Sequence, residues 1–213
     1  MRFDLYTAIH KTQRFHLGRL AERIGRADAT DPDIWPALAV EVRTWLEHLR
    51  AHAHHEHDLI HPLFERCGDR ATVLDAEHEA LERAMHEVEQ VLDASRWGEL
   101  YARFAAFLGT YFVHIAEEER LQAAVLWPSY SDAELSEVFV RFRRSRSAED
   151  AGRDLELMLP ALPLGDLTRI YADIRRSAPS VVWEASIALA RRILPSAELQ
   201  QLEGRLSAVG AFA

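Results

Sequence analysis

Two stretches, HAHHEHDLIHPLF at residues 52–64 and HIAEEERL at residues 114–121, place histidine and glutamate inside apolar heptad patterns. His52 and Glu56 lie four residues apart in the first stretch, as His114 and Glu118 do in the second. In a helix this spacing stacks two side chains on one face, one turn apart. The sequence therefore presents an imidazole and a carboxylate together on each of two helices.

Four segments of the chain carry such a pattern, with core positions that alternate in steps of three and four. This spacing is typical of helices packed into a bundle. The stripes are Phe3, Tyr6, His10, Gln13, Leu17, Leu20, Ile24; Leu38, Val42, Trp45, Leu49, His52, Glu56, Leu59, Leu63; Leu74, His78, Leu81, Met85, Val88, Leu92; and Leu100, Phe104, Phe107, Tyr111, His114, Glu118, Leu121, Val125. They predict an all-α fold, an up-down-up-down four-helix bundle.

A histidine interrupts every stripe, and the interruptions fall at one level of the predicted bundle. The starts of the first and third helices lie beside the ends of the second and fourth in this topology. Burying an unpaired imidazole or carboxylate costs several kcal/mol, so such groups stay inside only when they are paired, hydrogen-bonded or bound to a metal. One shared layer of six side chains is therefore predicted to bind metal: His10, His52, Glu56, His78, His114 and Glu118.

Helical angles indicate which neighbouring groups face this layer. Glu118 lies 40° from His114 at about 100° per residue, whereas Glu119 lies about 140° away, so Glu118 is the predicted ligand. The same reasoning predicts that His54, His57 and His61 face solvent. Mixed nitrogen and oxygen ligands with two bridging carboxylates suit iron or manganese. Four histidines and two glutamates would also support zinc.

These motifs resemble those of the hemerythrin-like (HHE cation-binding) family. The resemblance rests on the lone histidine in Ile9-His10-Lys11, on the stretches at 52–64 and 114–121, and on Glu77-His78 at the start of the third helix. It covers roughly residues 1–128. The resemblance implies a non-haem di-iron site with Glu56 and Glu118 as bridging ligands, and oxygen binding or the sensing of iron or oxygen.

One departure from the family pattern concerns the third helix. Family members with full oxygen-carrier chemistry have a second histidine one turn after the position of His78, and Glu82 stands there in this chain. Glu82 is kept as a less certain ligand. The departure weakens the case for stable oxygen transport, but an open coordination position would permit a small ligand such as oxygen to bind.

The composition sets wider limits on function. The 213 residues carry a net charge of −9, most of it in the predicted bundle, which argues against nucleic-acid binding as the main role. No apolar run approaches the ~20 residues that cross a membrane, and the first residues, MRFDLYTAIHKTQ, show no signal peptide. The single cysteine, Cys67, excludes an internal disulfide, and we expect a cytoplasmic protein.

Helix-start and helix-stop residues divide the chain into an expected bundle at 1–128 and an extension of short helices at 129–213. The bundle helices are expected at about 3–26, 36–66, 71–94 and 96–127, the second distorted at Pro62 and the fourth ending before Pro128. Further helices are expected at about 132–145, 148–159, 164–177, 180–193 and 196–207. Their apolar faces must be covered, and a cap on the bundle or a homodimer interface is the hypothesis.

Three classes of function compete. The first is a di-iron protein that binds or senses oxygen or iron, without catalysis. The second is an oxidase-like or peroxidase-like enzyme at the same site, although the Glu-x-x-His pairs that ferritin-like proteins place on two helices are absent. The third is a regulatory helical protein whose site is degenerate or occupied by zinc. We rank them in this order.

Overall fold

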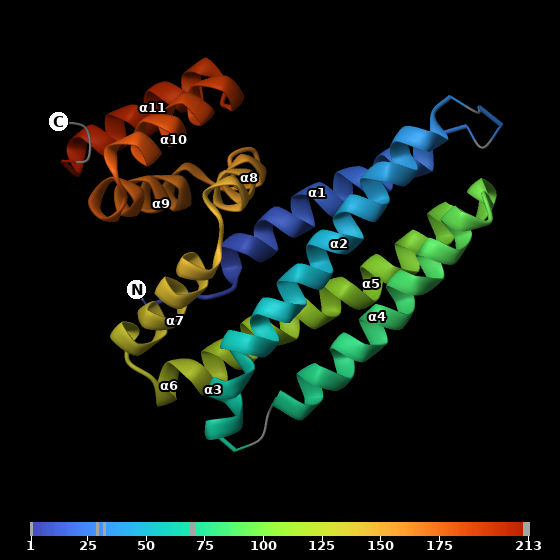
Figure 1. Cartoon of the computed structure of the whole chain (residues 1–213), viewed down its shortest axis with the longest axis horizontal. Coiled ribbons are helices and arrows are strands. Elements are labelled where there is room, and N and C mark those ends of the chain that lie inside the picture. Colours follow the sequence, from blue (N-terminus) through green and yellow to red (C-terminus); the bar gives the residue numbers. More distant parts are fainter. Residues whose placement is uncertain (1, 29, 32, 69–70, 211–213) are drawn as a thin grey trace. The chain divides into compact units, whose positions relative to one another are not determined.

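Helices make up nearly all of the computed structural model, which describes residues 2–28, 30–31, 33–68 and 71–210. Four long helices dominate its N-terminal part (Figure 1). They are α1 (Thr7–Arg26), α2 (Trp35–Leu59), α4 (Ala71–Asp93) and α5 (Trp97–Leu121), and a short helix α3 (His61–Arg66) follows α2. The predicted all-α fold is confirmed, and part of the predicted turn at 67–70 lies outside the described residues.

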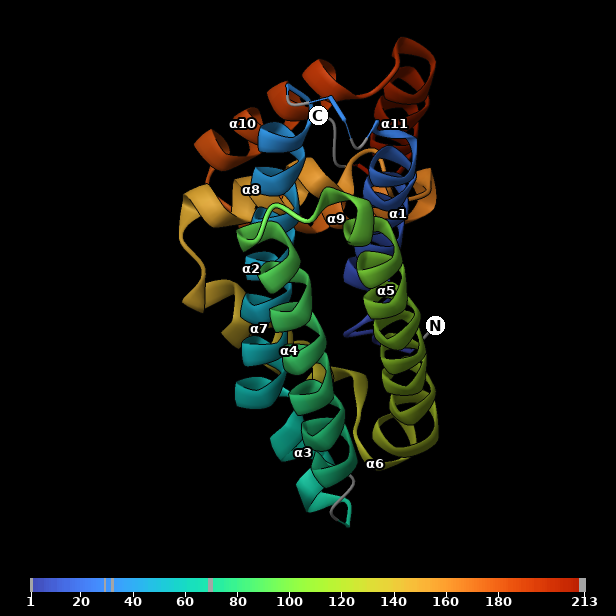
Figure 2. The ribbon, with the colours of Figure 1, turned by 90° about the vertical axis from the view of Figure 1, so that its right-hand side faces the viewer.

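The long helices lie side by side as a bundle, and consecutive ones run in opposite directions (Figures 1 and 2). Ion pairs join neighbouring helices along their edges. Arg50 of α2 contacts Glu82 at 2.9 Å and Glu89 at 2.7 Å, both on α4. Arg14 of α1 contacts Glu119 of α5 at 2.6 Å. Exposed ion pairs of this kind contribute little free energy, and apolar burial supplies most of the stabilisation.

The predicted stripes form the interior of the bundle. Apolar stripe residues are buried on all four long helices, among them Leu17, Leu20, Val42, Leu49, Leu74, Val88, Leu100 and Phe104. Polar members of the stripes are buried as well, including His10, Gln13, Glu56, His114 and Glu118. The heptad reading of the sequence therefore identified the inward face of each helix, polar positions included.

The break between α2 and α3 differs from the single predicted helix at 36–66. Helix α2 ends at Leu59, and α3 begins at His61 with Pro62 in its first turn. Proline has no N–H to donate to the carbonyl of the preceding turn, so a continuous helix cannot pass through this point undisturbed. The predicted distortion at Pro62 is confirmed, and it changes the direction in which His61 points.

The end of the fourth bundle helix also differs from its prediction. Helix α5 continues as a π-helical segment, η1 (Gln122–Leu126), and then as α6 (Trp127–Ser129), so the helix does not end before Pro128. Pro128 lies in the first turn of α6, where its missing N–H needs no partner. The Gln122 side chain accepts a hydrogen bond from the Leu5 N–H at 2.7 Å and fastens the N-terminal segment to this region.

Contacts divide the chain into two compact units, and each is considered by itself. The first combines the N-terminal residues up to Thr7 with Gln13–Phe142, and the second combines Ala8–Thr12 with the chain from Arg143 onward. Most of α7 (Asp132–Ser145) therefore groups with the bundle, where Leu135 and Val138 share a core with Phe64. The predicted domain division after residue 128 stays a prediction.

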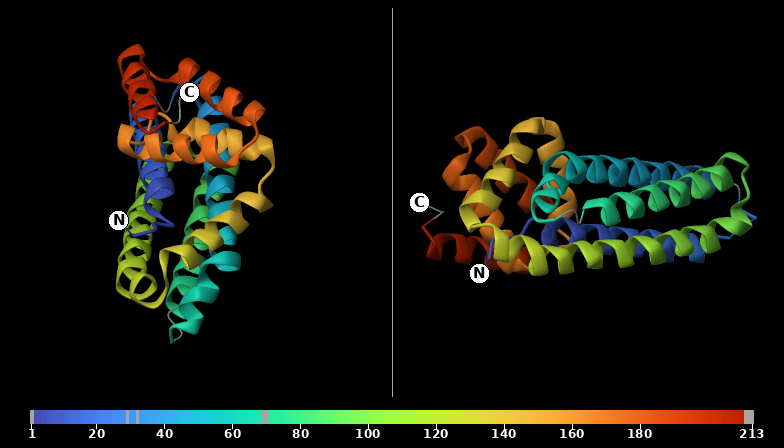
Figure 3. Two further views of the ribbon diagram at one scale, coloured as in Figure 1. Left: turned by 90° about the vertical axis from the view of Figure 1, so that its left-hand side faces the viewer. Right: turned by 90° about the horizontal axis from the view of Figure 1, so that it is seen from below.

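The short C-terminal helices, orange to red in Figure 3, begin and end close to their predicted bounds. They are α8 (Ala148–Met158), α9 (Leu164–Ser177), α10 (Ser180–Ile193) and α11 (Ser196–Ala208). Their buried residues form one apolar cluster that includes Leu155, Leu167, Tyr171, Ile187 and Leu202. The apolar faces of these helices therefore cover one another. Within the described part of the chain, every helix is too short or too polar to cross a bilayer.

Helix α5 offers a matched test of the bundle core. Phe104 is fully buried, whereas Val113 on the same helix is exposed. Phe104→Ala is expected to lower the free energy of unfolding by about 3–5 kcal/mol, because it removes apolar burial and leaves a cavity. Val113→Ala is expected to change it by less than about 0.5 kcal/mol. Urea unfolding of both variants measures this, and equal losses would contradict the assigned inward face.

Candidate metal centre

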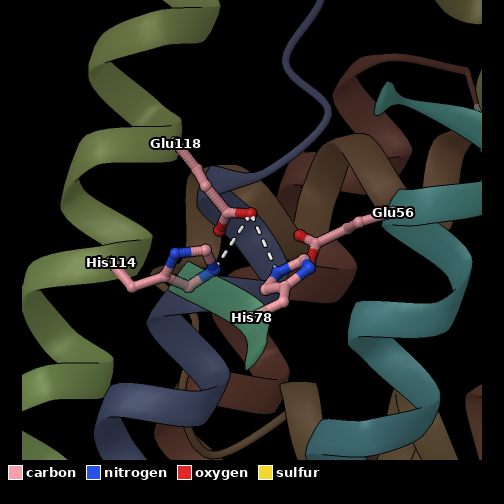
Figure 4. Close-up of side chains that lie close together, drawn as sticks. All are labelled: Glu56, His78, His114 and Glu118. Atoms are coloured by element: carbon pink, nitrogen blue, oxygen red, sulfur yellow. Dashed lines mark ion pairs between the residues drawn. The ribbon is translucent and has the colours of Figure 1, made fainter. Parts of the chain in front are cut away.

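Four predicted ligands from three helices meet inside the first unit. Glu56 comes from α2, His78 from α4, and His114 with Glu118 from α5 (Figure 4). Each can offer one ligand atom such that all four atoms lie within 4.8 Å of one another. The structure therefore brings together two imidazoles and two carboxylates that the sequence places far apart.

His78 lies between the two carboxylates of this group. Its Nε2 atom is 3.5 Å from Oε2 of Glu56 and 3.7 Å from Oε1 of Glu118. The same Oε1 atom of Glu118 is 3.2 Å from Nε2 of His114 (Figure 4). The imidazole nitrogens thus face the carboxylate oxygens across a small gap, which is the arrangement that a shared cation requires.

Burial makes this arrangement costly unless the charges are compensated. Glu118 has no exposed surface, and Glu56 and His114 are each 3% exposed. Two buried carboxylates side by side repel each other and lose their hydration. His52 adds one more imidazole next to this pair, with its Nε2 atom 3.0 Å from Oε1 of Glu56. Positive charge, from protons or from metal ions, must therefore balance the centre.

A carboxylate that the sequence analysis did not assign holds His114 in place. Nδ1 of His114 lies 2.8 Å from Oε2 of Glu77 on α4, so Nε2 faces the centre. Metal-binding histidines commonly have their second nitrogen fixed by a carboxylate in this way. Glu77 precedes His78 directly, and only the pairing of α4 with α5 reveals that it serves the histidine of the neighbouring helix.

The same contacts control the protonation of His114. Burial alone would lower the pKa of its imidazole, but the hydrogen bond and charge of Glu118, the hydrogen bond to Glu77 and the charge of Glu56 together raise the pKa to about 9. In the metal-free chain His114 is therefore protonated at neutral pH and supplies part of the balancing charge. A metal ion that binds there must displace this proton.

Two tyrosines flank the centre, as the stripes predict. Desolvation, together with the charges of Glu56 and Glu118, raises the pKa of Tyr6 and of Tyr111. The buried hydroxyl of Tyr111 forms no hydrogen bond with any of the described residues. The amide of Gln13 is also buried without a hydrogen-bond partner in that part of the chain. Both groups retain the capacity to bond a small molecule.

Two other predicted ligands, His10 and Glu82, are not members of this group of four. His10 is buried on α1, but it lies in the stretch Ala8–Thr12 that groups with the second unit, so its ligand role stays a prediction. Glu82 is exposed and pairs with Arg50, and it is in none of the potential ligand groups found among the described residues. The exposed location of Glu82 at the bundle edge therefore does not support its assignment as a metal ligand.

The solvent-facing assignment of three histidines is only partly correct. His54 and His57 are exposed, at 71% and 65% of their side-chain surface, but His61 is 1% exposed. The prediction for His61 was wrong because it carried the helical phase of α2 through Ile60, where the helix breaks. The turn into α3 points His61 inward, where its ring stacks on His78 with centroids 5.1 Å apart.

A cavity of about 510 Å³ opens beside the centre between α2 and α4. Glu56, His78 and His114 line it, and so do apolar side chains including Leu49, Leu81 and Met85. A small molecule could therefore reach the imidazoles and one carboxylate along a largely apolar wall. Of the ligand types that proteins offer, this set of imidazoles and carboxylates suits divalent ions of the first transition row.

A variant of Glu77 tests how His114 is held. Glu77→Gln keeps the size of the side chain but removes the charge that orients Nδ1, so metal affinity is expected to fall about 10–100-fold. Glu87→Gln is the matched control, because Glu87 lies on the same helix and pairs with Arg103 of α5 at 2.7 Å. Titration of the metal-free chain measures both affinities. Equal affinity in both variants would remove Glu77 from the centre.

The raised pKa of His114 predicts a pH dependence of stability in the metal-free chain. A pKa that folding raises from 6.5 to about 9 stabilises the fold fully below pH 6.5 and no longer does so above pH 9. As the pH rises from 6.5 to 9, the free energy of unfolding should therefore fall by on the order of 3 kcal/mol. The urea midpoint, measured across this pH range, should fall with it. With metal bound, the proton is already displaced, and this decline should disappear. A decline that persists unchanged in the metal-loaded chain would contradict the assignment.

Comparisons with known proteins agree with this geometry. The hemerythrin HHE cation binding domain matches residues 2–126. Iron-sulfur cluster repair protein YtfE of Yersinia pseudotuberculosis (serotype IB, strain PB1/+) and that of Yersinia pestis (strain Pestoides F) are each 27% identical over 125 residues, covering 53% of this chain and 57% of theirs. The chain thus spans a little more than half the length of these curated relatives. No solved structure matches it. Because the domain match covers more than half of the sequence, this chain belongs to the hemerythrin HHE cation-binding domain family.

Proposed function

We propose that this protein holds two iron ions in the bundle interior, with Glu56 and Glu118 as the carboxylates shared between them. The observation that carries the proposal is the pair of buried carboxylates on either side of His78, with separations of 3.5 and 3.7 Å. A single divalent ion would already balance the charge of the two carboxylates, so charge alone does not require a second ion. The argument for a second ion is the number of donors: His52 lies 3.0 Å from Oε1 of Glu56, outside the group of four. His10 stays a predicted ligand of that second ion.

The residues around the proposed irons would hold and shield them. His78 and His114 supply neutral imidazoles, and Glu77 fixes the tautomer of His114. Bound iron would supply redox chemistry and open positions for a small ligand. Residue 82 is a glutamate where a second histidine would add a ligand, and its carboxylate forms an ion pair with Arg50 at the bundle edge. One coordination position of the iron would therefore stay open.

A small, weakly polar ligand such as oxygen fits the cavity beside the centre. Leu49, Leu81 and Met85 give part of the cavity an apolar wall, against which a weakly polar ligand can pack. The hydroxyl of Tyr111, buried near Glu56 and without a partner among the described residues, could donate a hydrogen bond to that ligand. These features support reversible binding or sensing of oxygen, which we rank ahead of turnover.

The names of the relatives suggest a second candidate function. Proteins called iron-sulfur cluster repair proteins match the same part of the chain, and a chain that exchanges iron through a cavity open to solvent would fit that process. In this reading the centre donates iron instead of responding to oxygen. The two candidates differ in whether the bound iron stays in place when an iron acceptor is added.

The proposal is tested by the absorption spectrum of the iron-loaded chain. We expect a charge-transfer band that appears with oxygen and disappears on anaerobic re-equilibration, without loss of iron. Glu56→Gln should weaken the band and lower the iron content, because it removes one shared ligand. His54→Ala, which changes an exposed histidine of the same helix, should leave both unchanged.

Other outcomes decide between the alternatives. Steady consumption of peroxide by the loaded chain would favour the oxidase-like enzyme. Transfer of iron to a chelating protein without any oxygen response would favour iron donation. A spectrum insensitive to oxygen, peroxide and acceptor alike would contradict the proposal that the centre handles a small ligand.

A further inference from the structure

A second group of metal-binding side chains lies on α2, α3 and α4, separate from the four residues of the centre. It consists of His57, His61 and Asp75. Oδ1 of Asp75 is 2.8 Å from Nδ1 of His61 and 3.4 Å from Nδ1 of His57. Ligand atoms from the three residues lie within 4.8 Å of one another. We propose that these three residues bind a divalent transition-metal ion at the exposed end of the cavity, as an outer site distinct from the centre.

The composition of the group fits such an ion. Two imidazoles and one carboxylate are the ligand set of many three-residue zinc, cobalt and ferrous sites, which complete their coordination with water. Two imidazole nitrogens already converge on one carboxylate oxygen in the metal-free chain. A cation that replaces the shared protons between these atoms would need little movement of the side chains.

The burial of His61 fixes one of the proposed ligand atoms. Its side chain is 1% exposed, and its ring stacks on His78 with centroids 5.1 Å apart. Nδ1 lies 2.8 Å from Oδ1 of Asp75, so the nitrogen that faces the outer site is held in place before any ion binds. A ligand atom that is already positioned loses little conformational freedom on binding, which favours an ion at this point.

The outer site and the centre open onto one cavity. His57 and Asp75 line the cavity of about 510 Å³ together with Glu56, His78 and His114. Exposure falls along this wall, from 65% for the side chain of His57 and 42% for Asp75 to 3% for Glu56. An ion held by His57 and Asp75 would therefore remain accessible to water, unlike one in the centre. This contrast predicts weaker binding and faster exchange at the outer site.

The test is a titration of the metal-free full-length chain with Co²⁺, followed by visible absorption and calorimetry. The unchanged chain should bind one Co²⁺ ion more than the His57→Ala variant does. If the variant still binds an ion at the outer site, its affinity for that ion should be at least about tenfold lower. His57 is exposed, so its removal leaves the fold intact. Asp75→Asn should have the same effect. His54→Ala is the matched control, since His54 is an exposed histidine of α2 that contacts Asp58 and lies outside the group.

A variant of the centre separates this proposal from the proposed function. Glu56→Gln should weaken binding at the centre and leave the outer ion in place. If His57→Ala and Asp75→Asn bind the same number of Co²⁺ ions as the unchanged chain, with the same affinities, the outer site does not exist. That result would leave the centre untouched, whereas an unaltered titration of Glu56→Gln would count against the centre and not against the outer site.

Discussion

Two carboxylates, Glu56 and Glu118, are buried together in the interior of the helical bundle, and much of the surrounding structure follows from the need to balance their charge. Each lies within 4 Å of an imidazole nitrogen. Isolated ionised carboxylates are not tolerated in such surroundings. The raised pKa of His114 is the response of the metal-free chain to this constraint, and a bound cation is the alternative response. The buried carboxylates are therefore balanced by a protonated histidine in the metal-free chain, and they would be balanced by the metal ion in the loaded chain.

The bundle positions these groups through ordinary helix packing. Apolar stripe residues above and below the centre fix the rotation of each helix, so the polar positions of the stripes must also point inward. Ion pairs at the edges, such as that of Arg50 with Glu89, lie outside this interior and contribute little by comparison. The precision of the site thus comes from the burial of neighbours such as Phe107 and Leu81, which have no metal chemistry of their own.

Much of the fold and of the site could be predicted from the sequence, for a physical reason. Heptad spacing reports the inward face of a long regular helix, and the positions of Glu56, His78, His114 and Glu118 depend on that face alone. The prediction failed at His61, because the helix breaks at Ile60 and the angular count no longer applies. It also missed Glu77, whose partner lies on another helix. Pairing between helices is not encoded in the periodicity of either one.

Glu82 is held away from the four residues of the centre. Arg50 binds its carboxylate at the bundle edge, at 2.9 Å, at the position where the sequence resemblance led us to look for a further ligand. The apolar cavity between α2 and α4 remains. A metal centre with an accessible side and fewer fixed ligands is suited to exchange, whether of a small ligand or of the metal itself.

The metal content of the purified chain decides whether the bundle interior holds a di-iron centre. We expect about two iron ions per chain, with ultraviolet–visible spectra that differ between the sample in air and the sample after anaerobic reduction. One zinc ion per chain, or a stably folded chain with no metal at any stage of purification, would contradict it. In a chain without metal, the buried histidines and glutamates would balance one another through protons alone.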